Sequence, residues 1–369
     1  MSSIHEKYQL KEVINASGRM TILGVSTPTE TVMDAVRDGL GQYFEMKDLV
    51  VKTGAYIAKL LNVEDAIVVS CASAGIAQSV AAVIVKDDPY LLENLHAHAH
   101  AHNVASEIVM PKGHNVNFGA PVGTMVTLGG GTLKEAGYAN ECSPAQLAAM
   151  ITPQTAAILY IKSHHCVQKS ILSVAEAAAV AKQHNLPLIV DAAAEEDLQC
   201  YYNMGADLVI YSGAKAIEGP TSGLVVGRSQ YIAWVRKQSL GIGRAMKVGK
   251  EGILGLTHAI TEYLQTEKET GQQMVAKMEH FVAQLNTLNG IDCRVVWDSA
   301  GRDIARAEIC FNETVLAMTT PEIVARLQGG DPAIYCRGYK ANDGIIEIDV
   351  RSVTSAQLDV IYQNIKALF

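Results

Sequence analysis

Tyr211-Ser-Gly-Ala-Lys215-Ala-Ile-Glu-Gly-Pro-Thr-Ser-Gly-Leu-Val-Val-Gly227 decides the fold, because this stretch sets a lysine between two short apolar runs that are typical of strands. In an open α/β sheet, ligands bind beyond the carboxyl ends of the strands, where Lys215 would lie. A lysine that is partly removed from water there can lose its proton and form an imine. A solvated lysine on a turn is the ordinary alternative.

Short β-branched runs alternate with alanine-rich stretches from Ala66 to about Gly227. This alternation is typical of βαβ units, and it predicts an α/β fold with a seven-stranded, mainly parallel sheet. The expected strands are residues 66–70, 107–110, 124–128, 156–161, 186–191, 207–211 and 223–226. The helices expected between them include residues 74–85 and 174–184.

The pattern changes on either side of this sheet. Helical signals at 28–40 and 48–61 precede it, and a long helical region from 249 to about 288 follows it. Two strands, a helix, two more strands and a final helix at 354–368 complete the chain. We therefore expect an N-terminal helical segment (1–62) that packs on the small domain or on a partner subunit. A large cofactor-binding domain (63–248) and a long helix with a small α+β domain (249–369) would follow.

Composition points to a protein that acts on small molecules. The 369 residues are 49% hydrophobic and 18% charged, which is enough apolar mass for one large core and a smaller domain. The net charge of −8 argues against a surface that gathers nucleic acid. Seven cysteines without a CxxC pair suggest reduced thiols and a cytoplasmic location. A polar N-terminus and the lack of a long uncharged stretch predict neither an export signal nor a membrane span.

A carboxylate ends an apolar run upstream of the lysine, in Leu188-Ile-Val-Asp191. Pyridoxal phosphate (PLP) chemistry needs an anion beside the pyridine nitrogen, because the protonated ring withdraws electrons from the substrate carbanion. Asp191 could supply this anion, or it could simply cap a helix.

A small-residue turn, Ser70-Cys-Ala-Ser73-Ala-Gly75, leads from a predicted strand into a predicted helix. Free backbone N–H groups at a helix start suit a phosphate monoester, with the Ser73 hydroxyl beside them. Taken alone the signal is weak, since such a turn also serves as an ordinary helix cap.

These three elements resemble, in order and spacing, the PLP enzymes of the aspartate-aminotransferase-like fold (fold type I). The chain resembles the selenocysteine-synthase-like group over nearly its whole length, and within it the bacterial D-glucosaminate-6-phosphate ammonia-lyases. The likeness rests on Val13-Ile-Asn-Ala-Ser-Gly-Arg-Met, the Asp191 and Lys215 stretches, Gly243-Arg-Ala-Met-Lys-Val-Gly-Lys250, Asp331-Pro-Ala-Ile-Tyr-Cys-Arg337 and Ile346-Glu-Ile-Asp-Val-Arg351.

The resemblance implies that Lys215 holds the cofactor covalently and that Asp191 is the partner of the ring nitrogen. It implies that the phosphate is held by Ser73, Ala74, Gly75 and Ser212. Members of the group form their sites between two subunits, so a homodimer or higher homo-oligomer is expected. Gly249 stands where the selenocysteine synthases usually have an Asp, and with the acidic charge this departure counts against selenium transfer onto tRNA.

Two histidines follow a strand end in Ile161-Lys-Ser-His164-His165. His165 is a candidate acid that could protonate a leaving hydroxyl, and His164 is a candidate substrate ligand; an unreactive histidine is as common. His114 lies where related enzymes place the group that stacks on the pyridine ring, and Phe118 is the second candidate.

Arginine binds a carboxylate through a two-pronged fork, and Arg337 and Arg351 are the candidates for a substrate carboxylate. Arg337 is the expected ligand, because the resembling proteins keep an arginine after Pro332-Ala-Ile-Tyr-Cys. Arg351 is more simply explained by an ion pair. Arg244 and Lys247 are candidate substrate ligands. Further phosphate partners, among which spacing does not choose, are Arg19, Lys52 and Lys250.

The run His96-Ala-His-Ala-His-Ala-His102 could bind a metal if it formed a strand, since alternate residues share a face. No Cys, Asp or Glu at ligand spacing accompanies it, so a solvent-exposed loop or helix is favoured and no metal is expected.

The resemblance implies a reaction that removes ammonia from a 2-amino-3-hydroxy acid, namely D-glucosaminate 6-phosphate. Lys215 would take the Cα proton, a hydroxyl would leave from C3, and hydrolysis would give 2-keto-3-deoxygluconate 6-phosphate. A PLP aldolase, racemase, aminotransferase or selenocysteine-synthase-like transferase is the alternative, because a cofactor site alone does not choose which bond breaks. A binding module without catalysis is a further alternative, against which Lys215 and Asp191 both argue.

Overall fold

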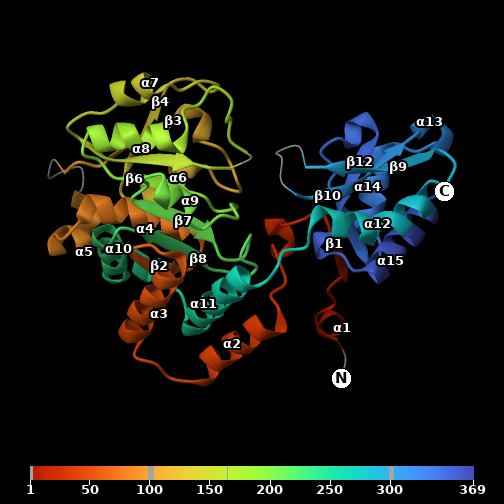
Figure 1. Cartoon of the computed structure of the whole chain (residues 1–369), viewed down its shortest axis with the longest axis horizontal. Helices are drawn as coiled ribbons and strands as arrows, with labels where there is room; N and C mark the ends of the chain where they lie inside the picture. The colour runs from red at the N-terminus through yellow and green to blue at the C-terminus, as the bar shows by residue number, and fades with distance from the viewer. Residues whose placement is uncertain (1–2, 99–103, 164, 299–302) are drawn as a thin grey trace. The chain divides into compact units, whose positions relative to one another are not determined.

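The computed structural model describes residues 3–98, 104–163, 165–298 and 303–369. The chain forms two compact units (Figure 1). The larger unit is Thr27–Gln265, and the smaller unit joins Met1–Ser26 to Thr266–Phe369. The boundaries predicted after residues 62 and 248 differ from this division, because three helices at those places pack on the larger unit.

These helices are α2 (Glu30–Gly41), α3 (Met46–Leu61) and α11 (Lys250–Gln265). Helix α3 packs against strand β2 of the large sheet and against α11, and α11 packs against α2. A methyl group at Gly255 would lie 2.5 Å from a Val36 side-chain carbon, so α2 and α11 approach closely through a glycine. The segment before the sheet therefore belongs mainly to the larger unit.

The larger unit contains a seven-stranded sheet of order β2-β8-β7-β6-β5-β3-β4. Only β8 runs antiparallel to its neighbours, which confirms the predicted mainly parallel sheet. The strands are β2 (Asp65–Val69), β3 (Glu107–Pro111), β4 (Thr132–Ala136), β5 (Thr155–Ile161), β6 (Leu188–Asp191), β7 (Leu208–Ser212) and β8 (Gly223–Gly227). The remaining α-helices of this unit are α4 (Ala72–Val85), α5 (Pro89–His98), α6 (Val122–Leu128), α7 (Pro144–Ala149), α8 (Val174–Gln183), α9 (Cys200–Asn203) and α10 (Ser229–Lys237).

One predicted strand is wrong. Residues 124–128 lie in helix α6, which begins after Pro121 and ends before Gly129. Val122 and Val126 are both buried, and their spacing of four residues suits one face of a helix. The strand in that part of the sheet is β4, which is the outermost strand and carries polar residues that conceal its strand character.

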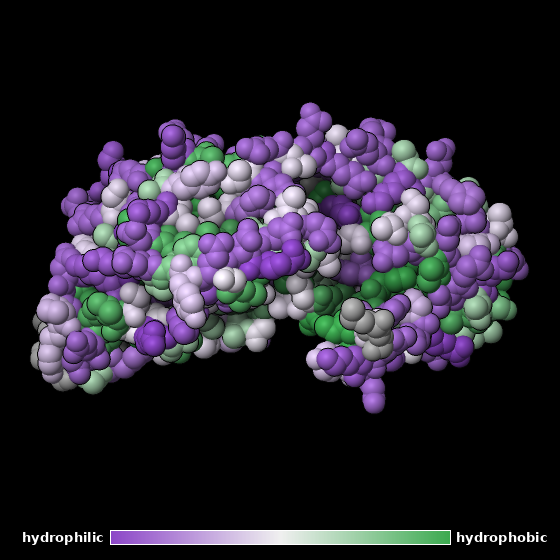
Figure 2. Space-filling model, turned by 90° about the horizontal axis from the view of Figure 1, so that it is seen from below, coloured by the Kyte–Doolittle hydropathy of each residue, from purple (hydrophilic) through white to green (hydrophobic). Residues whose placement is uncertain are grey.

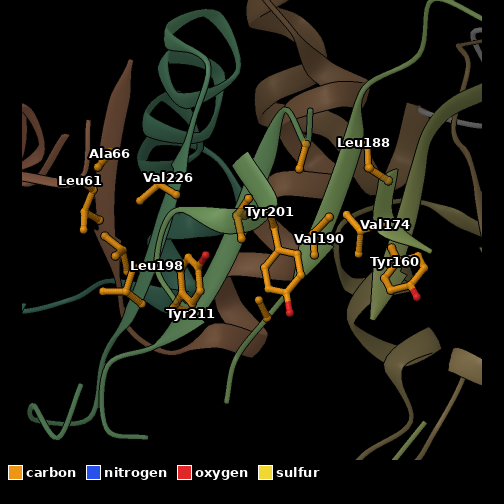
Figure 3. Close-up of a cluster of buried hydrophobic side chains, with 14 of the residues drawn as sticks. Leu61, Ala66, Tyr160, Val174, Leu188, Val190, Leu198, Tyr201, Tyr211 and Val226 are labelled. Atoms are coloured by element: carbon orange, nitrogen blue, oxygen red, sulfur yellow. The ribbon is translucent and has the colours of Figure 1, made fainter. Parts of the chain in front are cut away.

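Side chains alternate between the two faces of each strand. In β6, Val190 faces the core that Figure 3 shows, whereas Ile189 belongs to the second core, to which helix α4 contributes. Asp191 lies two residues after Ile189 and so on the α4 face. Ser212 follows Ile210 on the same face of β7 by the same spacing. The alternation therefore brings both candidate residues to the face that α4 covers.

The smaller unit has the predicted order of strand, strand, helix, strand, strand and helix. Its antiparallel sheet has the order β12-β10-β9, and a separate parallel pair joins β1 to β11. The strands are β1 (Val13–Ala16), β9 (Ile291–Trp297), β10 (Ala305–Phe311), β11 (Ala333–Cys336) and β12 (Ile345–Asp349). The helices are α1 (Ile4–Tyr8), α12 (Gly271–Leu285), α13 (Glu313–Leu316), α14 (Thr320–Gly329) and α15 (Ser355–Lys366).

Hydrophilic side chains cover much of one face of the protein, with smaller hydrophobic patches between them (Figure 2). Among the residues that the structure describes, no helix is long and apolar enough to cross a membrane.

Candidate active site at the carboxyl edge of the large sheet

Six strands of the large sheet, all except β8, end at the same edge. Strands β5, β6 and β7 are parallel, and β2 runs in the same direction as β7 because both are antiparallel to β8. Gly223, the first residue of β8, pairs with Val69 at the end of β2 and with Ser212 at the end of β7. The start of α4 and the segments around Asp191 and Lys215 therefore meet at this edge, where α/β sheets bind ligands.

Glycine at position 223 lets the turn before α4 approach β8 closely. A methyl group there would lie 2.5 Å from the Cys71 carbonyl carbon and 2.8 Å from the Ala72 nitrogen. These are backbone atoms, which cannot move aside as a flexible side chain would. The close approach fixes the N-terminus of α4 beside the start of β8.

The first turn of α4 offers backbone donors, but not all those predicted. Cys71 caps the helix: its Sγ accepts the Ala74 N–H at 3.3 Å and its carbonyl accepts the Gly75 N–H at 3.0 Å. Ala72 and Ser73 precede the first N–H groups that can find acceptors within the helix. The donors suited to an anion are thus those of Ala72 and Ser73, whereas Ala74 and Gly75 supply the fold.

Asp191 is a buried carboxylate without a cation in direct contact. It is 8% exposed, and one oxygen accepts the Ala193 N–H at 3.1 Å. Burial raises its pKa to about 6, although the charge of Lys215 and the Ala193 N–H both act to lower it. No ion pair joins Asp191 to any residue within the described ranges. A positive group placed against it would relieve the cost of burying this charge.

Lys215 lies on a loop that its own backbone hydrogen bonds hold together. The Gly213 N–H donates to the Ser222 carbonyl, and the Gly219 N–H donates to the Gly213 carbonyl, both at 2.8 Å. The Lys215 N–H donates to the Ser212 carbonyl at 3.3 Å. The half-buried lysine is near enough to Asp191 to lower the pKa of that carboxyl. The hydrogen-bonded loop therefore places the Lys215 amine close enough to the buried carboxylate for its charge to act on it.

His114 does not present a ring face for stacking. It is fully buried, its Nδ1 accepts the Ile161 N–H at 3.3 Å, and its ring meets that of Tyr160 edge-on at 4.5 Å. Burial and the charge of Lys162 lower its pKa to about 4, which keeps the imidazole neutral near pH 7. Stacking on a cofactor would require this buried ring to move, whereas Phe118, the second candidate, is 40% exposed.

The segment after β5 contains His165 and a lysine that sequence reasoning missed. His165 is exposed, and His164 lies outside the described residues. The Lys162 N–H donates to the Asp191 carbonyl at 2.8 Å, and its Nζ donates to Gln168 at 3.3 Å. Burial and the charge of Asp191 raise the pKa of Cys166 to about 12. The signal for Lys162 was a charge placed directly after seven buried strand residues.

The basic segment after α10 divides into exposed and engaged residues. Arg244 and Lys247 are exposed. Lys250 instead donates to the backbone carbonyls of Leu40 and Gln42, at the end of α2. Lys52 pairs with Asp48 on the same helix. Arg244 and Lys247 therefore remain the candidate anion ligands of this unit.

The remaining candidates behave differently from one another. Arg337, Arg351 and Arg19 belong to the smaller unit, where Arg337 pairs with Glu347 and Arg351 pairs with Asp349, as an ion-pair explanation of Arg351 requires. His96 is in α5, whereas His100 and His102 lie outside the described residues. No group of three or more potential metal ligands occurs in the described part of the chain.

The site fits the cofactor that the sequence predicts. The buried carboxylate of Asp191, which has no ion-pair partner among the described residues, suits the ring nitrogen of PLP. The half-buried Lys215 suits the aldehyde, and the two N–H groups at the start of α4 suit the phosphate. The three groups come from β6, the β7–β8 loop and α4, which share one edge of the sheet. The protein thus provides an opposite charge or a reactive group for each end of the cofactor.

This architecture is the aspartate-aminotransferase-like fold. An aspartate aminotransferase of Thermus thermophilus shares it with a TM-score of 0.52 at 13% identity, covering 99% of this chain and 94% of that one. The model of the family described as SelA, L-seryl-tRNA selenium transferase, matches residues 13–289, and the chain belongs to this family. Families with SelA-like and aminotransferase-like folds depend on PLP.

Two curated relatives match almost the whole chain. A D-glucosaminate-6-phosphate ammonia lyase of Salmonella typhimurium (strain 14028s / SGSC 2262) is 41% identical over 99% of this chain and 98% of its own length. A 5'-C-glycyluridine monooxygenase-decarboxylase of a Streptomyces species is 35% identical over 93% of this chain and 86% of its own length. A solved structure of a D-glucosaminate-6-phosphate ammonia-lyase superposes with a TM-score of 0.94 at 41% identity, covering 100% of this chain and 98% of that one.

Proposed function

We propose that this chain is a PLP-dependent ammonia-lyase that converts D-glucosaminate 6-phosphate to 2-keto-3-deoxygluconate 6-phosphate and ammonia. The observation that carries the proposal is the buried carboxylate of Asp191, which lies near Lys215 but forms no ion pair with any of the described residues. The choice of substrate rests on the full-length similarity to the Salmonella ammonia lyase. The expectation of a small-molecule substrate and a cytoplasmic enzyme belongs to the same proposal.

Each residue at the sheet edge has a role in binding the cofactor. Bound PLP would supply an electron-withdrawing ring that stabilises negative charge at the substrate Cα. Asp191 would hold a proton on the ring nitrogen, and Lys215 would attach the cofactor through Nζ. The Ala72 and Ser73 N–H groups and the Ser212 side chain would bind its phosphate. Asp191 would then be charged, because the ring cation replaces the missing counter-ion.

The protein groups move two protons in the proposed reaction. Lys215 Nζ takes the proton from Cα of the substrate. The C3–O bond breaks and the hydroxyl leaves with a proton from an acid, for which the exposed His165 is our candidate. The resulting 2-enamine gains a water molecule in place of the one that was lost and releases ammonium. The sum converts one amino acid molecule to one keto acid and one ammonia.

Substrate anions require cationic ligands. We assign Arg244 and Lys247 of the larger unit, Arg337 of the smaller unit and His164 to this role as candidates. Family resemblance adds a homodimer or larger homo-oligomer in which subunits share sites. Neither nucleic acid nor a membrane is part of the proposal.

Product analysis tests the proposal. The purified protein, supplied with PLP, should release one ammonia per 2-keto acid from D-glucosaminate 6-phosphate. D-Gluconate 6-phosphate, which lacks the amine, should yield none. An aminotransferase would require a keto-acid acceptor, a racemase would release no ammonia, and an aldolase would produce an aldehyde. Any of those results would replace the lyase while leaving the cofactor site in place.

One alternative has its own support. The Streptomyces relative, a monooxygenase-decarboxylase by name, shows that 35% identity on this scaffold accompanies different chemistry. Dependence of product formation on oxygen would favour that class. Selenium transfer is less well supported, because the net charge of −8 does not suit tRNA.

A further inference from the structure

A cluster of charged side chains lies on one face of the small sheet, within the smaller unit. Residues Ala307 and Ile309 of β10 belong to the apolar core of that unit. Arg306 and Glu308 alternate with them and therefore lie on the opposite face. Both are nevertheless buried, at 3% and 4% exposed. Charges are seldom buried to this extent unless a specific set of partners holds them.

The carboxylates of this cluster are already paired. Glu308 contacts Arg294 at 2.6 Å and Lys340 at 3.2 Å. Glu347 contacts Arg337 at 3.1 Å and Lys340 at 3.5 Å. Each of these carboxylates has two cationic neighbours. Their negative charges are therefore largely compensated and would repel an incoming anion only weakly.

The guanidinium of Arg306 is not completely paired. Its Nε contacts Asp349 at 3.1 Å, and its Nη1 contacts Asp298 at 2.9 Å. Its Nη2 is buried and has no hydrogen-bond partner in the described part of the chain. A buried donor left without an acceptor lowers stability, because it has lost its hydrogen bonds to water. The structure therefore contains an unmet donor on a charged group that is almost fully enclosed.

A cavity of about 380 Å³ has Arg306 among its lining residues. Four cations line it, namely Arg294, Arg306, Arg337 and Lys340, together with three carboxylates, which gives a net charge of one positive. Tyr339 and Trp297 form part of its wall. The volume lies in the range that small-molecule sites occupy.

We propose that this cavity binds a small organic acid of sugar-acid size through its carboxylate or phosphate. The guanidinium of Arg337 and the ammonium of Lys340, which both line the cavity, supply the N–H donors, and an arginine fork matches the paired oxygens of such anions. The inference rests on the smaller unit alone and stands whether or not the proposed lyase activity is found. The anion is either an end of the enzyme's own substrate or a separate effector.

Trp297 provides a local readout, because the chain has only one other tryptophan, Trp234, which belongs to the larger unit. In the Trp234→Phe holoprotein, titration with D-gluconate 6-phosphate should change the Trp297 fluorescence in a saturable manner. Arg337→Gln should weaken binding at least tenfold. Lys340→Gln, at a half-exposed position, should weaken it several-fold and provides a second variant if Arg337→Gln fails to fold. Arg326→Gln, at an exposed position on α14, should leave it unchanged.

Two further arms identify the anion and its source. D-Gluconate and D-glucitol 6-phosphate, each with one of the two acidic groups, show which group the cavity reads. If D-glucosaminate 6-phosphate displaces the probe from the Lys215→Ala protein, the anion bound in the cavity is part of the substrate. If no displacement occurs, the anion is a separate effector. A fluorescence signal that does not saturate, or affinity unchanged in both folded variants, would overturn the proposal.

Discussion

Two buried aspartates end apolar strands in this protein, and they differ in what surrounds them. Asp349 ends β12 in the smaller unit and contacts Arg306 at 3.1 Å and Arg351 at 2.8 Å. Burial alone would raise its pKa, but the two arginines outweigh burial and lower it to about 2. Asp191 ends β6 in the larger unit, where burial dominates and raises the pKa to about 6. Both residues are buried aspartates at the end of a strand, but Asp349 has arginine partners whereas Asp191 forms no ion pair with the described residues.

This difference separates a structural charge from a functional one. When both partners of a buried ion pair belong to the protein, removing either one destabilises the native state, because the other charge is left buried and unpaired. A buried carboxylate without its counter-ion costs stability, and such costs concentrate at sites that bind ligands. The comparison therefore supports a structural role for Asp349 and the proposed cofactor-binding role for Asp191.

The largest effect is expected from removing the amine beside Asp191. Lys215→Ala should lower ammonia release on the order of 10³-fold or more, because both the attachment point and the base are lost. Lys182→Ala, an exposed position on α8, should leave the rate unchanged. Initial rates from saturating D-glucosaminate 6-phosphate measure both. If the rate of ammonia release by Lys215→Ala were within tenfold of the wild-type rate, the functional role proposed for the Asp191 site would be contradicted.

Asp349→Asn should destabilise the protein by about 3–5 kcal/mol, since it leaves Arg306 and Arg351 without their shared carboxylate. Urea unfolding of the apoprotein at pH 7.5 measures the change. Asp359→Asn, an exposed position on α15, serves as the matched control and should shift stability by less than about 0.5 kcal/mol. Equal stabilities for the two variants would show that Asp349 is not the structural charge that we describe.

Asp191→Asn should have the opposite sign in the apoprotein. Because its folded pKa of about 6 exceeds the ordinary 3.8, the folded state retains a proton that the unfolded chain releases, and this group's contribution to stability falls as pH rises through that window. Above pH 6 the variant should therefore be more stable than wild type by about 2–3 kcal/mol. Urea unfolding at pH 5 and pH 7.5 should show the advantage shrinking at the lower pH.

That variant should also lose its ammonia release, so that stability and activity move in opposite directions. A gain in stability that persists undiminished at pH 5, or a loss at pH 7.5, would contradict the assignment of an uncompensated charge to Asp191.

The smallest effect is expected from the close approach beside the first turn of α4. Gly223→Ala should destabilise the protein by about 1–3 kcal/mol and weaken PLP binding, because its methyl group would meet backbone atoms of Cys71 and Ala72. Gly41→Ala, where a methyl group meets open space, is the control. Thermal unfolding measures the change in stability, and PLP titration measures the change in affinity. If Gly223→Ala matched the wild type in both, the close approach of Gly223 to the first turn of α4 would not be needed for stability or for PLP binding.

Much of the larger unit could be predicted from sequence because its strands are short, buried runs. Such runs identify their own ends, and Asp191, Ser212 and Lys215 are all defined by their distance from a strand end. The prediction failed at residues 124–128, where five apolar or β-branched residues in a row favour a strand. The buried residues Val122 and Val126 are instead spaced by one helical turn, and the segment forms a helix. The edge strand β4 was missed for the converse reason, since polar side chains hide it.

The local details of the site depended on contacts that sequence spacing does not contain. Cys71, rather than a serine, caps α4 and uses two of the predicted anion donors. Burial of His114 accompanies its packing on Tyr160, a residue of strand β5 that is distant in the sequence. The Arg306 cluster joins three strands of the small sheet, and Arg306-Ala-Glu308 reads in sequence as an exposed, alternating edge. Long-range pairing, which sequence alone did not supply, turned those exposed-looking charges into a buried network.

The central claim is that Lys215, near the buried Asp191, is the attachment point for PLP. Reduction of the holoprotein with borohydride, followed by peptide mapping by mass spectrometry, tests it most directly. We expect the visible absorption to disappear and one pyridoxyl group to be found on the peptide that contains Lys215. A pyridoxyl group on Lys162 or on another lysine, or a protein that binds no PLP at all, would contradict the account.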